Sequence, residues 1–341
     1  MIFYLARKHQ TLSTQLTHFP GKLAAQLRFL TYDDLFGRAV LPAGTYIFTD
    51  FDRLRTDRFA RLCALWDWFE ATGCALSRLN DPRRFLSRFD LLRRLHDAGI
   101  NDFNVHALED WREVRSFPVF IRKDKHQDQP DTPLLRTKTD LAEAVARLRG
   151  AGPKKRMIVE FANDAFGDGR YRKYGAFRVG QTQFVQHCYM STSWYIKSHE
   201  ADRTDADLAE AERYRMANPH ARQIAEAFDL ASVDYGRMDY GIAGDRIQIY
   251  EINTNPTVIA PNPKIDSLPF ARRVEEAILK LPEGNAAEVR LPPELVDSAA
   301  IALPIEKAHE RALAESIKTR TKRRGATGLL ASIAARLLTL R

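Results

Sequence analysis

Cysteine is scarce in this sequence, and long apolar runs are missing from it. The 341 residues include three cysteines, Cys63, Cys74 and Cys188, and their spacing forms no CxxC pair. This usage argues against a disulfide framework or a zinc site and favours a reducing compartment, which we expect to be cytoplasmic. No apolar run approaches the roughly 20 residues of a membrane-spanning helix. The apolar residues 2–6 lack the preceding charge and the length of a signal peptide, so we expect none.

The composition is ordinary for a soluble globular protein. Hydrophobic residues make up 45% of the chain and charged residues 28%, and the length suffices for two or three domains. The formal net charge of +8 is compatible with an anionic small molecule, a nucleic acid or a membrane surface. Charge alone therefore selects none of these partners.

The first 80 residues have the pattern of a small α/β domain. Apolar side chains at helical spacing predict a helix over 58–71. Strands are expected at 2–5, 45–49 and 75–79.

A second helix is expected over 83–98. Asp81 can cap this helix, and Pro82 suits its first position. Gly99 can end it, because glycine adopts the left-handed conformation that often follows a helix.

A predicted β-hairpin carries the most informative residues of the sequence. Two short strands, 238–242 and 246–253, are joined by a turn at 243–245. Because side chains of a strand alternate between its faces, Glu251 and Asn253 lie on one face.

The length of the turn decides which residues oppose one another. With a three-residue loop, Ile242 pairs with Arg246. Asp239 then becomes the diagonal neighbour of Glu251. A two-residue loop would place Asp239 opposite Tyr250 and turn it to the wrong face. We therefore expect the three-residue loop, which gathers two carboxylates and an amide oxygen on one patch.

Two neighbouring carboxylates repel each other unless a positive charge lies between them. Oxygen-only ligands suit Mg²⁺, which binds through one or two carboxylates, waters and substrate phosphates. The alternative is a solvated polar face on an edge hairpin, and these residues alone weigh the two interpretations evenly. Asp239, Glu251 and Asn253 are thus candidate metal ligands.

The same stretch resembles a known signature. The run Met-Asp-Tyr-Gly, a short turn and the run Ile-Tyr-Glu-Ile-Asn-Thr-Asn-Pro-Thr are similar to the metal-binding segment of the ATP-grasp superfamily. The resemblance implies an α/β (α+β) fold with a small N-terminal α/β domain and two subdomains that sandwich a nucleotide. It also implies that Asp239, Glu251 and Asn253 hold Mg²⁺, or Mn²⁺ in its place, against the phosphates of ATP. Asn255 and Pro256 match a segment that often faces the acceptor substrate.

The resemblance runs in order over about residues 80–260 and divides the chain into four parts. These are an N-terminal α/β domain at 1–80, a first ATP-grasp subdomain at 81–160, a second subdomain with the metal site at 161–281, and a linker with a basic amphipathic tail at 282–341.

The resemblance implies phosphate contacts after the strand at 117–123. A basic residue there would reach the α- and β-phosphates, and since side chains alternate, either Arg122 or Lys123 faces the site. The superfamily then has a glycine-rich loop, whereas residues 124–133 contain no glycine. Without glycine, a nest of backbone N–H donors forms less readily, and the chain departs from the superfamily at this point.

The nucleoside contacts are implied further along the chain. The side chain of Glu160 and the backbone of Phe161 match the hinge that meets the adenine edge. Asp164 or Asp168 would reach a ribose hydroxyl.

The resemblance implies an enzyme, an ATP-dependent ligase that joins a small-molecule carboxylate to a small-molecule amine through an acyl-phosphate. A cation, Lys173 or Arg172, would stabilise the transferred γ-phosphoryl group. The alternative is an ATP-binding regulatory or scaffold protein without turnover, which the glycine-free loop and the basic tail motivate.

The C-terminal tail differs in character from the rest of the chain. Five cations lie in 318–324, and apolar side chains follow at helical spacing over 329–338. Such a segment suits a membrane surface or a partner, but it is more often a solvated helix that covers its own protein, and we favour the latter. Nucleic-acid binding is disfavoured because the cations are not interleaved with aromatic residues. The sequence indicates no oligomeric state.

Overall fold

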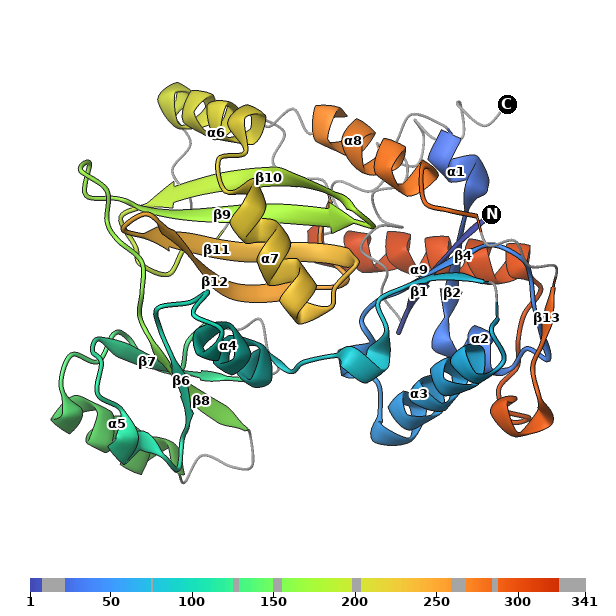
Figure 1. Ribbon diagram of the computed structural model, residues 1–341, viewed down its shortest axis with the longest axis horizontal. Helices are drawn as coiled ribbons and strands as arrows, with labels where there is room; N and C mark the ends of the chain where they lie inside the picture. The colour runs from blue at the N-terminus through green and yellow to red at the C-terminus, as the bar shows by residue number, and fades with distance from the viewer. Residues whose placement is uncertain are drawn as a thin grey trace. The chain divides into compact units, whose positions relative to one another are not determined.

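The computed structural model has an α/β fold, as the sequence predicts (Figure 1). The structure describes residues 1–7, 22–74, 76–124, 129–149, 155–197, 204–258, 268–283 and 288–324. The chain divides into two compact units, which are Met1–Arg83 with Thr254–Arg341 (unit 1) and Arg84–Asn253 (unit 2). Within the described ranges, no helix has both the length and the apolar character needed to cross a membrane.

Unit 1 is built on a parallel sheet with the strand order β2-β1-β4-β5. The strands are β1 (Ile2–Ala6), β2 (Leu27–Thr31), β4 (Thr45–Phe48) and β5 (Ser77–Leu79). All residues of β1 are buried, which is typical of a central parallel strand. Three strands match the predicted positions. Strand β2 was not predicted, because helices adjoin both of its ends without a glycine or proline to mark them.

Helices cover this sheet, and two short strands pair beside it. The helices of unit 1 are α1 (Lys22–Gln26), α2 (Tyr32–Phe36), α3 (Thr56–Ala71), α8 (Leu268–Leu279) and α9 (Ile305–Arg324). Helix α3 is the amphipathic helix predicted over 58–71, and it buries Leu62, Leu65, Trp66 and Phe69.

The segment expected to be a linker and a tail is part of unit 1. Strand β13 (Val289–Arg290) pairs antiparallel with β3 (Val40–Leu41). Helix α9 packs against β2, where the ring of His309 stacks on Phe29 at 5.4 Å between centroids. The basic run 318–324 forms the last turns of α9. The apolar positions over 329–338 lie outside the described residues.

Unit 2 contains two antiparallel sheets. The smaller has the order β6-β8-β7, with β6 (Val105–Ala107), β7 (Val119–Lys123) and β8 (Arg156–Glu160). The larger has the order β10-β9-β11-β12, with β9 (Tyr171–Val179), β10 (Thr182–Ser191), β11 (Tyr235–Ala243) and β12 (Arg246–Asn253). The helices are α4 (Arg88–Asp97), α5 (Lys138–Arg149), α6 (Asp205–Ala217) and α7 (Ala221–Ala231).

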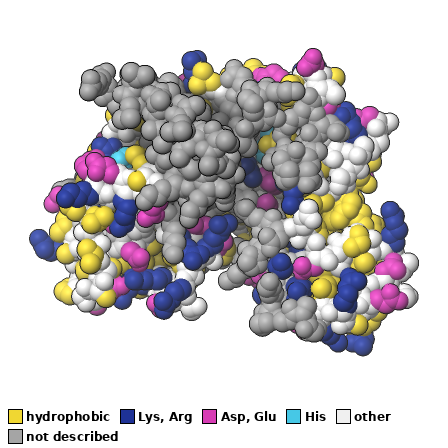
Figure 2. Space-filling model, turned by 180° about the vertical axis from the view of Figure 1, so that it is seen from behind, with side chains coloured by type: hydrophobic (Ala, Val, Ile, Leu, Met, Phe, Trp, Pro, Cys, Tyr) yellow, Lys and Arg dark blue, Asp and Glu magenta, His cyan; other side chains and the backbone are white. Residues whose placement is uncertain are grey.

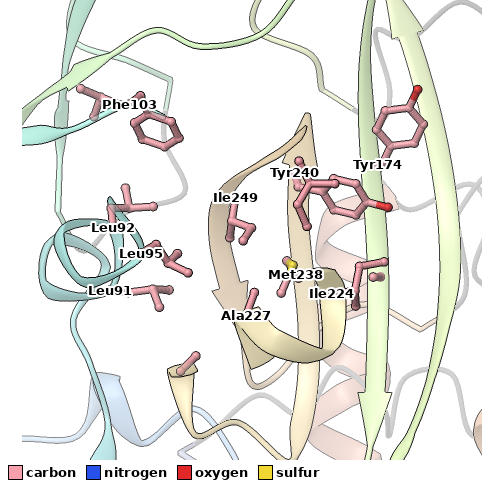
Figure 3. Close-up of a cluster of buried hydrophobic side chains, with 14 of the residues drawn as sticks. Leu91, Leu92, Leu95, Phe103, Tyr174, Ile224, Ala227, Met238, Tyr240 and Ile249 are labelled. Carbon is pink, nitrogen blue, oxygen red and sulfur yellow. The ribbon is translucent and has the colours of Figure 1, made fainter. Parts of the chain in front are cut away.

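One face of the larger sheet forms the core of unit 2. Leucines of α4 point toward Ile249 on β12, and Met238 and Tyr240 of β11 lie in the same buried cluster (Figure 3). Ile224 and Ala227 bring α7 onto this face. By alternation, the other face of β9 and β11 carries the polar side chains of Lys173, Arg237 and Asp239, together with the buried rings of Phe177 and Tyr235.

Helix α4 begins later than predicted. Residues Pro82–Arg84 form a separate 3₁₀ turn, in which Asp81 accepts a hydrogen bond of 2.9 Å from the Arg83 N–H. The helix starts at Arg88 after Ser87, whose hydroxyl accepts from the Asp90 N–H at 3.2 Å. The predicted start at residue 83 is therefore wrong, because Asp81 stabilises the preceding turn instead.

Charges of both signs are present among the described side chains on the side shown in Figure 2. Among the described side chains there, Lys and Arg are interspersed with Asp and Glu.

A glycine in β9 allows close packing against β10. Gly175 pairs in register with His187, and a Cβ added at Gly175 would lie 2.2 Å from Cε1 of His187. The His187 ring is buried and stacks on Tyr189 at 4.0 Å between centroids, so it has little freedom to turn away.

We predict that Gly175→Ala destabilises the protein by about 1–3 kcal/mol through this overpacking. The measurement is the free energy of unfolding from urea denaturation. Gly167→Ala is the matched control, because its added methyl group would have no atom within 4 Å. Equal stability of the two variants would contradict the close packing of His187 on β9.

Candidate active site

The hairpin of β11 and β12 carries all three predicted metal ligands. Its turn has two residues, Gly244 and Asp245, and Ala243 pairs with Arg246, so the predicted three-residue loop is wrong. Gly244 has a φ of 59°, which suits glycine, and its N–H donates to Oδ2 of Asp164 at 2.7 Å. The carboxylate of Asp164, one of two considered for ribose binding, thus stabilises the turn.

A β-bulge restores the pairing that a two-residue turn would otherwise shift. Tyr240 pairs with Ile249. The next pair is Asp239 with Glu251, which leaves Tyr250 as the extra residue on β12. The two carboxylates converge as predicted, but they are directly opposed rather than diagonal.

Asp239 is a buried carboxylate with a cation on each side. The residue is 2% exposed. Its Oδ2 lies 2.9 Å from Nζ of Lys173 in β9, and its Oδ1 accepts a hydrogen bond of 2.8 Å from Nε of Arg237. Burial raises the pKa of Asp239, but Arg237 and Lys173 more than offset this and hold the pKa well below its usual range. Asp239 is therefore ionised at neutral pH.

Glu251 forms the second half of the cluster. Its carboxylate makes an ion pair with Arg88, the first residue of α4, which lies 163 positions earlier in the chain. Burial raises the pKa of Glu251, whereas the charges of Arg88, Lys173 and Arg122 lower it, and the resulting pKa lies below its usual value. Helix α4 thus supplies a cation to the edge strand of the larger sheet.

Alternation along β7 separates Arg122 from Lys123. Arg122 lies within electrostatic range of the cluster, since its pKa is lowered by burial and by Arg88 while Glu251 opposes the shift. Nζ of Lys123 lies 3.9 Å from Oδ1 of Asp131. Of the two candidates, Arg122 is therefore the one brought near Glu251.

The same alternation along β9 separates Lys173 from Arg172. The guanidinium of Arg172 lies 2.7 Å from Oδ1 of Asp168 and 3.0 Å from Oε1 of Glu210 in α6. The hydrogen bond from Arg172 holds the pKa of Asp168 well below its usual range. Lys173 thus reaches Asp239, while Arg172 and Asp168, the second ribose candidate, pair with each other on the opposite face.

The two predicted adenine contacts make hydrogen bonds within unit 2. Oε1 of Glu160 lies 3.0 Å from Nε2 of His106, and Oε2 accepts from the Asn104 N–H at 2.9 Å. The N–H of Phe161 donates to the carbonyl of Pro118 at 2.9 Å. The carboxylate of Glu160 and the N–H of Phe161 therefore already have partners here.

Sequence reasoning missed Arg88 and Arg237. Arg237 lies two residues before Asp239 on one strand, so strand alternation would have placed both on the same face. Arg88 was not identified because the predicted helix began at residue 83, which placed Arg88 in the helix interior rather than in its first turn.

The donors at the hairpin fit a hard cation such as Mg²⁺. Opposed Asp239 and Glu251 offer carboxylate oxygens, and Asn253 is two positions beyond Glu251, opposite Arg237. In the described part of the chain, no three or more His, Cys, Asp or Glu side chains are grouped as a metal site. A cation at Asp239 would therefore share that carboxylate with Lys173 and Arg237 and would need further oxygens, such as those of phosphates.

Comparisons with known proteins give structural matches only. No protein-family model and no curated protein sequence matches the chain. The ATP-grasp ligase PsnB, complexed with its minimal precursor, is 12% identical, with a TM-score of 0.49 over 82% of this chain and 99% of that chain.

Two further solved structures show similar values. N5-carboxyaminoimidazole synthase from Aspergillus clavatus is 11% identical, with a TM-score of 0.47 over 86% of this chain and 79% of that chain. D-alanine–D-alanine ligase from Bacillus anthracis is 11% identical, with a TM-score of 0.47 over 82% of this chain and 96% of that chain.

We predict that Asp239→Asn lowers the free energy of unfolding by about 3 kcal/mol at pH 7, because the partly buried cations Lys173 and Arg237 would lose their carboxylate. Urea denaturation measures the change. Asp168→Asn, on the opposite face, should cost much less, because the Asp168 side chain is 36% exposed and Arg172 keeps Glu210 as a partner.

The difference in free energy of unfolding between the native protein and Asp239→Asn should depend on pH. Since the pKa of Asp239 is lowered on folding, its stabilising effect is complete above the ordinary carboxyl pKa of about 4 and is lost as the pH falls below it. The difference between native protein and Asp239→Asn should therefore shrink below about pH 4. A difference that stays constant down to pH 2 would contradict the ion pairing.

Proposed function

We propose that this protein is an enzyme, an ATP-dependent ligase that joins a carboxylate to an amine through an acyl-phosphate. The observation that carries the proposal is the ion cluster of unit 2, in which Asp239 and Glu251 face each other among cations. The hairpin that supplies both carboxylates also has the order and spacing that resemble the ATP-grasp signature.

The charge balance of the cluster favours a polyanion. Among its described residues, four cations surround Asp239 and Glu251, and the buried carboxylate of Asp124 also acts on Arg122, so the cations outnumber the carboxylates. The cations are Lys173 and Arg237 at Asp239, with Arg88 and Arg122 at Glu251. A triphosphate carries several negative charges and would be attracted to such a site.

The cations differ in what they can do. The planar guanidinium of Arg122 can bind two phosphate oxygens at once, whereas the ammonium of Lys173 acts as a point charge. Lys173 would stabilise the negative charge of the transferred phosphoryl group. Arg237 and Arg88 keep the two carboxylates ionised and in position.

Asp239, Glu251 and Asn253 are the residues that would hold Mg²⁺, with Mn²⁺ as a substitute. When bound, the ion supplies positive charge that neutralises the phosphates during transfer. The chain itself supplies positioning and electrostatics, and the substrate carboxylate is the nucleophile that takes the phosphoryl group. The amine then displaces phosphate from the acyl-phosphate.

We predict tight, Mg²⁺-dependent ATP binding to the native chain, weakened about 10-fold or more in Glu251→Gln because a metal ligand is lost. Isothermal titration calorimetry with and without Mg²⁺ measures it. Glu210→Gln is the control, since Glu210 pairs with Arg172 on the opposite face. Binding that ignores Glu251 would refute the site, and binding without ADP release in any pool of acids and amines would favour the regulatory alternative.

A matched pair on β7 tests the phosphate contact. Arg122→Met should weaken ATP binding by about 10-fold or more, because a charged hydrogen bond contributes roughly 1.5–3 kcal/mol. Lys123→Met should change it little, since Lys123 lies beside Asp131. Both dissociation constants are measured at one salt concentration. A larger effect of Lys123→Met would mean that the two residues have been assigned to the wrong faces.

A further inference from the structure

We propose that Lys173 and a divalent cation compete for Asp239, and that ATP opens this carboxylate to the metal by drawing Lys173 to its phosphates. The inference rests on the proposed ATP site and adds a coupling between its two ligands. Its test uses metal binding without nucleotide, so that the inference and the proposed function can fail separately.

Both oxygens of Asp239 already face cations. Nζ of Lys173 lies 2.9 Å from Oδ2, Nε of Arg237 lies 2.8 Å from Oδ1, and the residue is 2% exposed. Mg²⁺ binds a carboxylate oxygen at about 2.0–2.1 Å. A metal ion on Oδ2 would therefore lie within a few ångströms of the ammonium group, and the repulsion between the two charges is strong where water is largely excluded.

The charge of Lys173 also interacts with both proposed metal ligands, Asp239 and Glu251. Burial lowers the pKa of Lys173, but Asp239 and then Glu251 raise it, and the resulting pKa is above its usual value. The ammonium group thus interacts with both opposed carboxylates, which is what a bridging metal ion would also do.

Lys173 is the cation better suited to move. Its charge is on a flexible four-carbon stem from the neighbouring strand β9, and 24% of its side chain is exposed. Arg237 is on the same strand as Asp239, and its planar guanidinium is the less adaptable partner. A triphosphate at the cluster offers the ammonium group of Lys173 a new anionic partner. If the ammonium group moves to the phosphates, Oδ2 of Asp239 becomes available to the metal ion.

The test is a titration of the full chain with Mn²⁺ in the absence of nucleotide. The electron paramagnetic resonance signal of the free ion gives the affinity. Lys173→Met should bind Mn²⁺ about 10-fold or more tightly than the native chain, because a repelling charge is removed. Lys173→Arg keeps the charge and should bind like the native chain. Arg172→Met, the neighbour on the opposite face, should also leave Mn²⁺ binding unchanged.

A second titration contains a non-hydrolysable ATP analogue. The higher Mn²⁺ affinity of Lys173→Met relative to the native chain should then disappear, because Lys173 of the native chain would contact the phosphates instead of Asp239. Adding Asp239→Asn to Lys173→Met should abolish the gain in Mn²⁺ affinity, which tests that the gain acts through this carboxylate. Circular dichroism of each variant verifies folding.

The inference is overturned if folded Lys173→Met binds Mn²⁺ no better than Arg172→Met in the absence of nucleotide. If ATP nevertheless binds to the native chain with Mg²⁺, the proposed function stands without the competition. If the gain appears but ATP does not bind, the competition at Asp239 stands and the proposed ligand is wrong.

Discussion

The proposed site depends on the two ion pairs that the Asp239 carboxylate makes with Lys173 and Arg237. A buried charge is tolerated only when it is paired, so each partner constrains the strands that carry it. Gly175, the residue opposite Asp239 on β9, has no side chain there, and the imidazole of His187 lies over it. A side chain at position 175 would therefore meet this ring directly beside Asp239.

The two faces of the larger sheet differ in content, since one packs against helices α4 and α7 and the other carries the proposed site. Leucines of α4 fill the apolar side, and the first residue of the same helix, Arg88, reaches Glu251. The helix that buries apolar surface therefore also fixes the charge and position of a proposed metal ligand. Packing and electrostatics are coupled here through one element, so a change in the core near α4 would also be felt at Glu251.

Much of this organisation follows from local sequence signals, and the rest depends on tertiary contacts. The hairpin, its carboxylates and helix α3 have clear periodicity or turn residues, so they could be predicted. Alternation reduced the choice at Arg122 and Lys123 to one residue, but which of them faces Glu251 depends on how β7 is oriented. The β-bulge at Tyr250 has no glycine to signal it.

The ion pair of Arg88 with Glu251 has a consequence for how the chain is assembled. Unit 2 is inserted between the two segments of unit 1, and these residues lie four positions after its first residue and two before its last. The ion pair therefore holds the first and the last residues of unit 2 close to each other. Domains whose two ends lie close together are the ones that chains tolerate as insertions, because the host chain is interrupted at a single place.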